Sequence, residues 1–157
     1  MKKSFIILLL IIGSLGYCGS FHNIPEKFQN TCQRIQLEFD IPDGLLYAVP
    51  MKESSWNPNT PVSSAACIGL MQLNPRYSDY FVESYWTYPE EFNINNPYHN
   101  LWMGFCYLSD LKARFITWEL ALAAYNAGPA RVARWDIPEE TIDYIVDIKN
   151  MMNEGLR

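Results

Sequence analysis

The chain has 157 residues, of which 49% are hydrophobic and 15% aromatic, and its net charge is −5. This length allows one domain with a real core and is too short for two comfortable ones. Lysine and arginine are few and scattered, which excludes a basic nucleic-acid-binding surface. The aromatic residues suit a helical core first, although tryptophan and tyrosine also suit a groove that binds sugars.

Residues 1–20 have the layout of a secretory signal peptide and are not expected to belong to the fold. Lys2 and Lys3 give a positive start, and an unbroken apolar run follows at residues 5–12. That run is too short to span a bilayer in the usual way. We therefore expect an exported protein of the periplasm or cell envelope, with its domain at residues 21–157.

Cys18 lies where a bacterial lipoprotein signal places its lipidated cysteine. Leu15 fits that pattern, whereas Tyr17 stands where a small residue is usual. Three outcomes are open at this end of the chain. Cys18 is lipidated and attaches the protein to a membrane, or cleavage near Ser20 discards Cys18, or the segment stays as an uncleaved anchor.

The rest of the chain shows helical periodicity and no useful two-residue alternation, so we expect a mainly α domain. Four apolar residues that recur at helical steps predict the first helix: Phe28, Cys32, Ile35 and Phe39. Further helices are expected at residues 45–53, 65–73, 98–114 and 118–125, and a last one from residue 138 onward. Residues 56–64 indicate a loop, and residues 76–97 indicate short helices and loops.

Glu53 ends an apolar helix and precedes a loop that contains Trp56. A carboxylic acid can protonate a departing oxygen at neutral pH only if its pKa is raised, and burial among apolar side chains raises it. Judged by residue type alone, a glutamate near a helix end is usually a solvated surface residue. The surrounding sequence therefore has to decide between the two interpretations.

Several short elements occur in a fixed order after residue 52. They are Glu-Ser-Ser-Trp-Asn-Pro at 53–58, Gly-Leu-Met-Gln at 69–72, Gly-x-x-Tyr-Leu at 104–108, Ala-Tyr-Asn-Ala-Gly-Pro at 124–129 and Glu-Thr-x-x-Tyr-Ile at 140–145. In this order and spacing they resemble the catalytic domain of the soluble lytic transglycosylases, lysozyme-like enzymes that cleave bacterial peptidoglycan. The resemblance covers about residues 45–148 and implies a single lysozyme-like helical domain with a catalytic cleft.

The resemblance also implies the residues of the site. Glu53 corresponds to the catalytic acid. Six further residues correspond to positions that bind substrate or face the cleft: Ser63, Gln72, Tyr107, Tyr125, Asn126 and Tyr144. Residue chemistry alone leaves other roles open, since Gln72 could make a buried structural hydrogen bond, Tyr107 could pack within its helix, and Asn126 could simply end a helix.

The reaction that the resemblance implies is cleavage of the β-1,4 bond between N-acetylmuramic acid and N-acetylglucosamine. The muramic 6-hydroxyl acts as the nucleophile and leaves a 1,6-anhydro end, so one carboxyl group suffices where ordinary glycosidases use two. One alternative is hydrolysis, as in goose-type lysozyme, which would need a second carboxylate from Asp79, Glu83, Glu90 or Glu91. Another is a non-catalytic scaffold that binds peptidoglycan.

Peptidoglycan glycan strands are the only partner that the sequence indicates. Protein partners stay unknown, and the role could be wall turnover or local opening of the wall for a secretion system, flagellum, conjugation apparatus or phage. No metal or cofactor is expected, because His22 and His99 are far apart and no Cys-x-x-Cys occurs.

The cysteines beyond the signal are Cys32, Cys67 and Cys106, and an oxidising compartment permits one disulfide that the spacing does not choose. Cys67 replaces the alanine that is usual in the family, and we expect it to be a small buried residue at that position.

Overall fold

The computed structural model describes residues 21–155, so the predicted signal peptide with Cys18 lies outside the described residues, as do residues 156–157. The α-helices are α1 (Glu26–Phe39), α2 (Asp43–Ser54), α3 (Ser78–Tyr85), α4 (Pro97–Phe115), α5 (Trp118–Ala127), α6 (Pro129–Ala133) and α7 (Glu139–Gly155). Short 3-10 turns occur at Phe21–Asn23 and Pro75–Tyr77. Within residues 21–155, no helix combines the length and the apolar character needed to cross a membrane.

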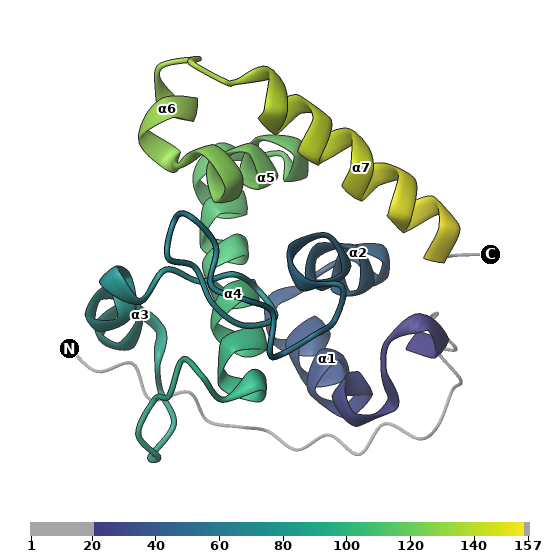
Figure 1. Ribbon diagram of the computed structural model, residues 1–157, viewed down its shortest axis with the longest axis vertical. Coiled ribbons are helices and arrows are strands. Elements are labelled where there is room, and N and C mark those ends of the chain that lie inside the picture. Colours follow the sequence, from purple (N-terminus) through teal and green to yellow (C-terminus); the bar gives the residue numbers. More distant parts are fainter. Residues whose placement is uncertain (1–20, 156–157) are drawn as a thin grey trace.

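The helices are arranged around α4, which runs through the middle of the molecule (Figure 1). Helices α1, α3 and α5 pack against α4, while α2 packs mainly against α7. Helix α5 also contacts α6 and α7 and so links the two groups of helices. The C-terminal end of α2 is consequently enclosed by elements from distant parts of the sequence.

The helical periodicity of the sequence corresponds to the buried faces of the helices. In α1, Phe28, Cys32 and Ile35 are buried, as their spacing predicts. In α4 a stripe that includes Leu101 and Phe105 is fully buried, and α5 buries most of its short apolar length. The expectation of a mainly α domain is therefore confirmed, because apolar side chains at helical spacing need a common core.

The expected helix at residues 65–73 is wrong. This segment is a series of turns that an antiparallel bridge closes, with backbone hydrogen bonds of 2.9 and 3.0 Å between Ile68 and Leu73. Gly69 and Gln72 have positive φ angles of 78° and 46°, which a right-handed helix does not allow. Leu70 and Met71 inside the turn are fully buried, so the apolar character of this segment reflects burial rather than helical structure.

Candidate active site

Glu53 lies in the last turn of α2. The helix ends because Ser55 adopts a left-handed conformation, with φ of 53°, and Trp56 follows with φ of 59°. The ring of Trp56 is buried and stacks on Phe28 at a centroid distance of 5.6 Å, which holds the departing chain against α1. Glu53 is thus half-buried at the negative end of a helix dipole, where ionisation of a carboxyl is disfavoured.

The carboxyl group of Glu53 faces the hydroxyl of Tyr144 on α7, which donates a hydrogen bond to Oε1 at 2.5 Å. Burial raises the pKa of Glu53 to about 7, against the opposing effects of the Tyr144 hydrogen bond and the charge of Lys52. The ammonium group of Lys52 is itself held by Asp147 at 2.6 Å. At neutral pH a large fraction of Glu53 is therefore protonated, as a proton donor in catalysis requires.

A cavity of about 630 Å³, which we call the cleft, lies between the turns at residues 67–74 and helices α3, α4, α5 and α6. Four of the predicted residues line it: Gln72, Tyr107, Tyr125 and Asn126. Burial raises the pKa of Tyr125 well above its ordinary value, and the charge of Glu53 adds to this shift. Glu53 and Tyr144 are not among the residues that line the cleft, but the charge of Glu53 acts on Tyr125, which is.

Ser63 does not belong to the cleft lining. Its hydroxyl accepts a hydrogen bond of 3.0 Å from the backbone N–H of Cys67, and its own N–H donates to the carbonyl of Cys67 at 3.1 Å. Ser63 therefore closes the turn that leads into residues 67–74. Its observed contacts are structural, and contact with substrate stays a prediction.

Cys67 differs from expectation because its segment is a turn rather than a helix. It is partly exposed and lines the cleft, so the expectation of a small buried residue is wrong. Burial nevertheless raises the pKa of its thiol, which keeps it largely protonated at neutral pH. Cys32 and Cys106 are buried, and the three cysteines in the part of the chain that the structure describes are free.

Side chains from α2, α5 and α4 hold the Gly-Leu-Met-Gln turn by hydrogen bonds to its backbone. Tyr125 of α5 donates its hydroxyl to the carbonyl of Met71 at 2.7 Å, and Ser54 of α2 donates to the carbonyl of Leu70 at 3.0 Å. Gln72 donates its side-chain amide to the carbonyl of Gly69 at 3.0 Å. Gln72 and Tyr125 therefore both line the cleft and shape it. The observed hydrogen bond of Gln72 is structural, and its contact with sugar stays a prediction.

Asn100 of α4 completes this set and was missed by the sequence analysis. It is fully buried, accepts a hydrogen bond from the N–H of Met71 at 2.8 Å, and donates to the carbonyls of Ile68 and Ile94 at 3.1 Å. A Cβ atom at Gly69 would lie 2.4 Å from the Asn100 amide nitrogen, so only glycine fits there. An asparagine beside a buried helical stripe is the signal that could have identified it.

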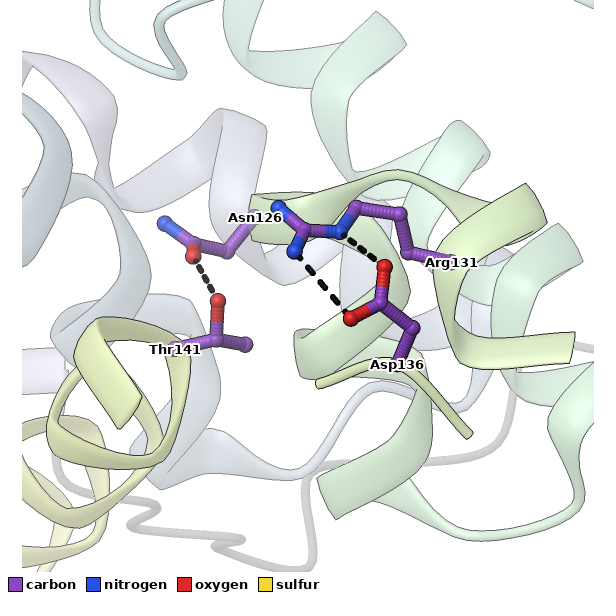
Figure 2. Close-up of polar contacts among 4 residues, drawn as sticks. All are labelled: Asn126, Arg131, Asp136 and Thr141. Atoms are coloured by element: carbon purple, nitrogen blue, oxygen red, sulfur yellow. Dashed lines mark hydrogen bonds and ion pairs between the residues drawn. The ribbon is translucent and has the colours of Figure 1, made fainter. Parts of the chain in front are cut away.

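Asn126 is oriented by Thr141, a second residue that the sequence analysis missed. The fully buried Thr141 hydroxyl donates to Oδ1 of Asn126 at 2.7 Å. Figure 2 shows the amide nitrogen of Asn126 pointing away from Thr141, with the ion pair of Arg131 and Asp136 nearby. The N–H donors of Asn126 are thus directed away from the protein contact. Thr141 lies in the same sequence element as Tyr144, which could have indicated it.

The four carboxylates that hydrolysis could use lie elsewhere. Asp79, Glu83, Glu90 and Glu91 line a separate hollow of about 970 Å³ beside α3, and none of them lines the cleft. The charged and polar groups that shift the pKa of Glu53 are Tyr144 and Lys52. Within residues 21–155, no three histidine, cysteine or acidic side chains are grouped so that they could hold a metal.

Sequence comparison connects this fold and site with a known family. The family described as "Transglycosylase SLT domain" matches residues 30–144. A protein of Haemophilus influenzae is 36% identical over 114 residues, which are 71% of this chain and 19% of that protein. The soluble lytic murein transglycosylase of Escherichia coli K12 is 30% identical over 114 residues, which are 71% of this chain and 18% of that protein.

Comparison of structures agrees. The 70 kDa soluble lytic transglycosylase of Escherichia coli superposes with a TM-score of 0.72 and 26% identity, over 87% of this chain and 25% of that one. An inactive mutant of lytic transglycosylase Slt from Pseudomonas aeruginosa gives 0.73 at 23% identity, over 83% of this chain and 24% of that one, and supports the fold alone.

The helical fold, with an acidic residue at a helix end beside a cleft, is thus that of a lysozyme-like domain. The chain belongs to the Transglycosylase SLT domain family. It spans about a fifth of the length of the curated relatives that it matches.

Proposed function

We propose that this protein is a peptidoglycan lytic transglycosylase. The observation that carries the proposal is the half-buried carboxyl of Glu53, with its pKa raised to about 7 and the Tyr144 hydroxyl at 2.5 Å, in a chain of this family. Such a carboxyl can give a proton at neutral pH and take one back. The substrate is the glycan strand of peptidoglycan, cleaved between N-acetylmuramic acid and N-acetylglucosamine.

The reaction proceeds in two proton transfers through Glu53. Its carboxylic acid gives a proton to the glycosidic oxygen as the bond from that oxygen to C1 of the muramic residue breaks, which releases N-acetylglucosamine with a free 4-hydroxyl. The resulting carboxylate removes the proton of the muramic 6-hydroxyl, whose oxygen bonds to C1. The product is a 1,6-anhydro ring, no water is consumed, and Glu53 ends in its initial state.

The other residues of the site hold the glycan and the acid. Tyr144 keeps the carboxyl of Glu53 in one orientation. Gln72, Tyr107, Tyr125 and Asn126 bind sugar along the cleft, and Ser63 contributes at the edge of its turn. Hydrolysis is disfavoured because its candidate second carboxylates line a different hollow. A scaffold that only binds peptidoglycan has no need of a glutamate whose pKa is raised.

We also propose that the protein works outside the cytoplasm, in the periplasm or cell envelope. The support is the signal-like sequence of residues 1–20, with its positive start and apolar run. Attachment to a membrane through a lipid on Cys18 is one of the three outcomes for that segment. Mass measurement of the N-terminal peptide isolated from cells decides among lipidation, cleavage and retention.

Mass spectrometry of the products from purified peptidoglycan sacculi tests the activity. We expect muropeptides about 18 Da lighter than their hydrolysed counterparts, because no water is added. We expect Glu53→Gln to fold normally and to lower the rate by about a hundredfold to ten-thousandfold, the usual contribution of a general acid. Hydrated reducing ends would identify a hydrolase instead, and absence of any release by the wild type would leave a binding role.

A further inference from the structure

The cleft is lined by positive charge although the chain is acidic. The net charge of the chain is −5, yet the described residues that line the cleft include Arg114 and Arg131 and no aspartate or glutamate. A cavity wall that carries charge of one sign concentrates ligands of the opposite sign, because charges act more strongly next to low-dielectric protein than in bulk water. The cleft therefore favours an anionic ligand wherever the charge of one of these arginines is not already neutralised by a neighbouring carboxylate.

The two arginines differ in how far their charge is already compensated. Arg131 donates from Nε and Nη2 to the two carboxylate oxygens of Asp136 at 3.0 and 3.3 Å, a two-point pair that is visible in Figure 2. Arg114 pairs with Asp110 across 3.6 Å, which is too long for a hydrogen bond. Its side chain is 49% exposed. The guanidinium of Arg114 is thus the cation that can exchange its weak pair for a ligand.

The surroundings of Arg114 add polar groups that suit the same ligand. Tyr107 and Arg114 both line the cleft, and the charge of Arg114 opposes the effect of burial, which raises the pKa of Tyr107. The exposed side chains of Tyr77 and Tyr80 line the same cavity. A planar guanidinium forms two parallel hydrogen bonds with a carboxylate, and phenol hydroxyls can bind further oxygen atoms beside it.

We propose that Arg114 binds a carboxylate of the side branch on the muramic residue and so makes cleavage selective for acidic glycan. This inference rests on the proposed function. Two sources of the carboxylate share this chemistry. One is the peptide stem, and the other is the lactyl group of residues without a stem, since the amide bond to a stem uses up the lactyl carboxyl. Both would lie along the cleft beyond Tyr107, on the side of α4.

Turnover of three glycans by the purified chain tests this proposal. The first is peptidoglycan with its peptide stems. The second is the same glycan after an amidase has removed the stems, which leaves the lactyl carboxylate. In the third, that carboxylate is converted to a neutral methylamide. We compare wild type with Arg114→Gln and with Lys112→Gln, which removes one positive charge from the same helix at a residue that does not line the cleft.

We expect the ratio of kcat/KM between a carboxylate-bearing glycan and the neutral glycan to fall about fivefold in Arg114→Gln, the size of a partly exposed ion pair. It should not change in Lys112→Gln. A fall confined to the stem-bearing glycan identifies the stem as the ligand. A fall confined to the glycan without stems identifies the lactyl carboxylate, and a fall with both acidic glycans shows that Arg114 accepts either carboxylate.

Two results would overturn the role of Arg114. One is an unchanged ratio in Arg114→Gln. The other is an equal fall in Lys112→Gln or in Asp110→Asn, which would assign the effect to the general field or to the ion pair. If the wild type cleaves none of the three glycans, the proposed function fails and this inference fails with it.

Discussion

The hydroxyl of Tyr144 and the carboxyl of Glu53 are joined by a hydrogen bond of 2.5 Å that links α7 to the end of α2 across 91 positions of the sequence. Burial raises the pKa of Tyr144 well above its ordinary value, and Glu53 adds to this shift. Tyr144 therefore keeps its proton over the whole range in which Glu53 titrates. Its hydrogen bond lowers the pKa of Glu53, but by less than burial raises it.

We expect Tyr144→Phe to raise the pKa of Glu53 above its value of about 7, because the lost hydrogen bond stabilises the carboxylate. The measurement is kcat/KM as a function of pH. Its alkaline limb, where the acid loses its proton, should move to higher pH, while Tyr98→Phe at an exposed tyrosine should leave it in place. A limb that moves to lower pH would contradict this role of Tyr144.

Glu53 should make the fold less stable as the pH rises. Its pKa is raised in the folded chain from 4.5 to about 7, so between these values the folded state binds more protons than the unfolded state. Below pH 4.5 the carboxyl is neutral in both states, and the free energy of unfolding is highest with respect to this group. As the pH rises to about 7 and above, the free energy of unfolding falls by roughly 3 kcal/mol, because the buried carboxyl must then be ionised. Urea unfolding of wild type and Glu53→Gln over this range should give a difference that changes with pH. Parallel curves would contradict the shift.

Thr141→Val removes the hydroxyl that orients Asn126 while keeping the side-chain volume. Because the amide can then turn, we expect kcat/KM on peptidoglycan to fall about tenfold, which corresponds to one lost hydrogen bond with good geometry. Thr141→Ser keeps the hydroxyl and should restore most of the activity. Equal losses in both variants, in step with their thermal stability, would indicate a packing role only.

Asn100→Ala should destabilise the fold by about 3 kcal/mol, because the N–H of Met71 and the carbonyls of Ile68 and Ile94 lose their buried partner. Urea unfolding measures this loss, with the exposed Asn95→Ala as the control. We further expect the remaining folded protein to bind glycan more weakly, since the turn that carries Gln72 is released. Full stability in Asn100→Ala would show that the turn is held by its other contacts.

The sequence predicted the elements whose apolar residues recur at helical spacing. Helix α4 was expected at residues 98–114 and begins at Pro97, where Asn96 caps it. Periodicity failed at residues 65–73, because a buried apolar pair inside a turn has the same composition as a short buried helix. The positive φ angle of Gln72, a residue that is not glycine, has no signature in the sequence.

The candidate site was predicted mainly from the family resemblance. Four of its residues line the cleft, and Tyr144 contacts Glu53. Ser63 lies outside the cleft lining and uses its hydroxyl within its own turn, so its contact with substrate stays a prediction. Asn100 and Thr141 act through hydrogen bonds to residues far away in sequence, and such pairs become visible only when the helices are packed.

The dependence of Glu53 on α7 has a consequence for biosynthesis. Tyr144 and Thr141 lie in α7, which is synthesised after α2, the helix that carries Glu53. A nascent chain that ends before residue 139 holds Glu53 without the tyrosine that orients its carboxyl group. The order of synthesis therefore delays the assembly of the pair formed by Glu53 and Tyr144 until α7 has docked against α2.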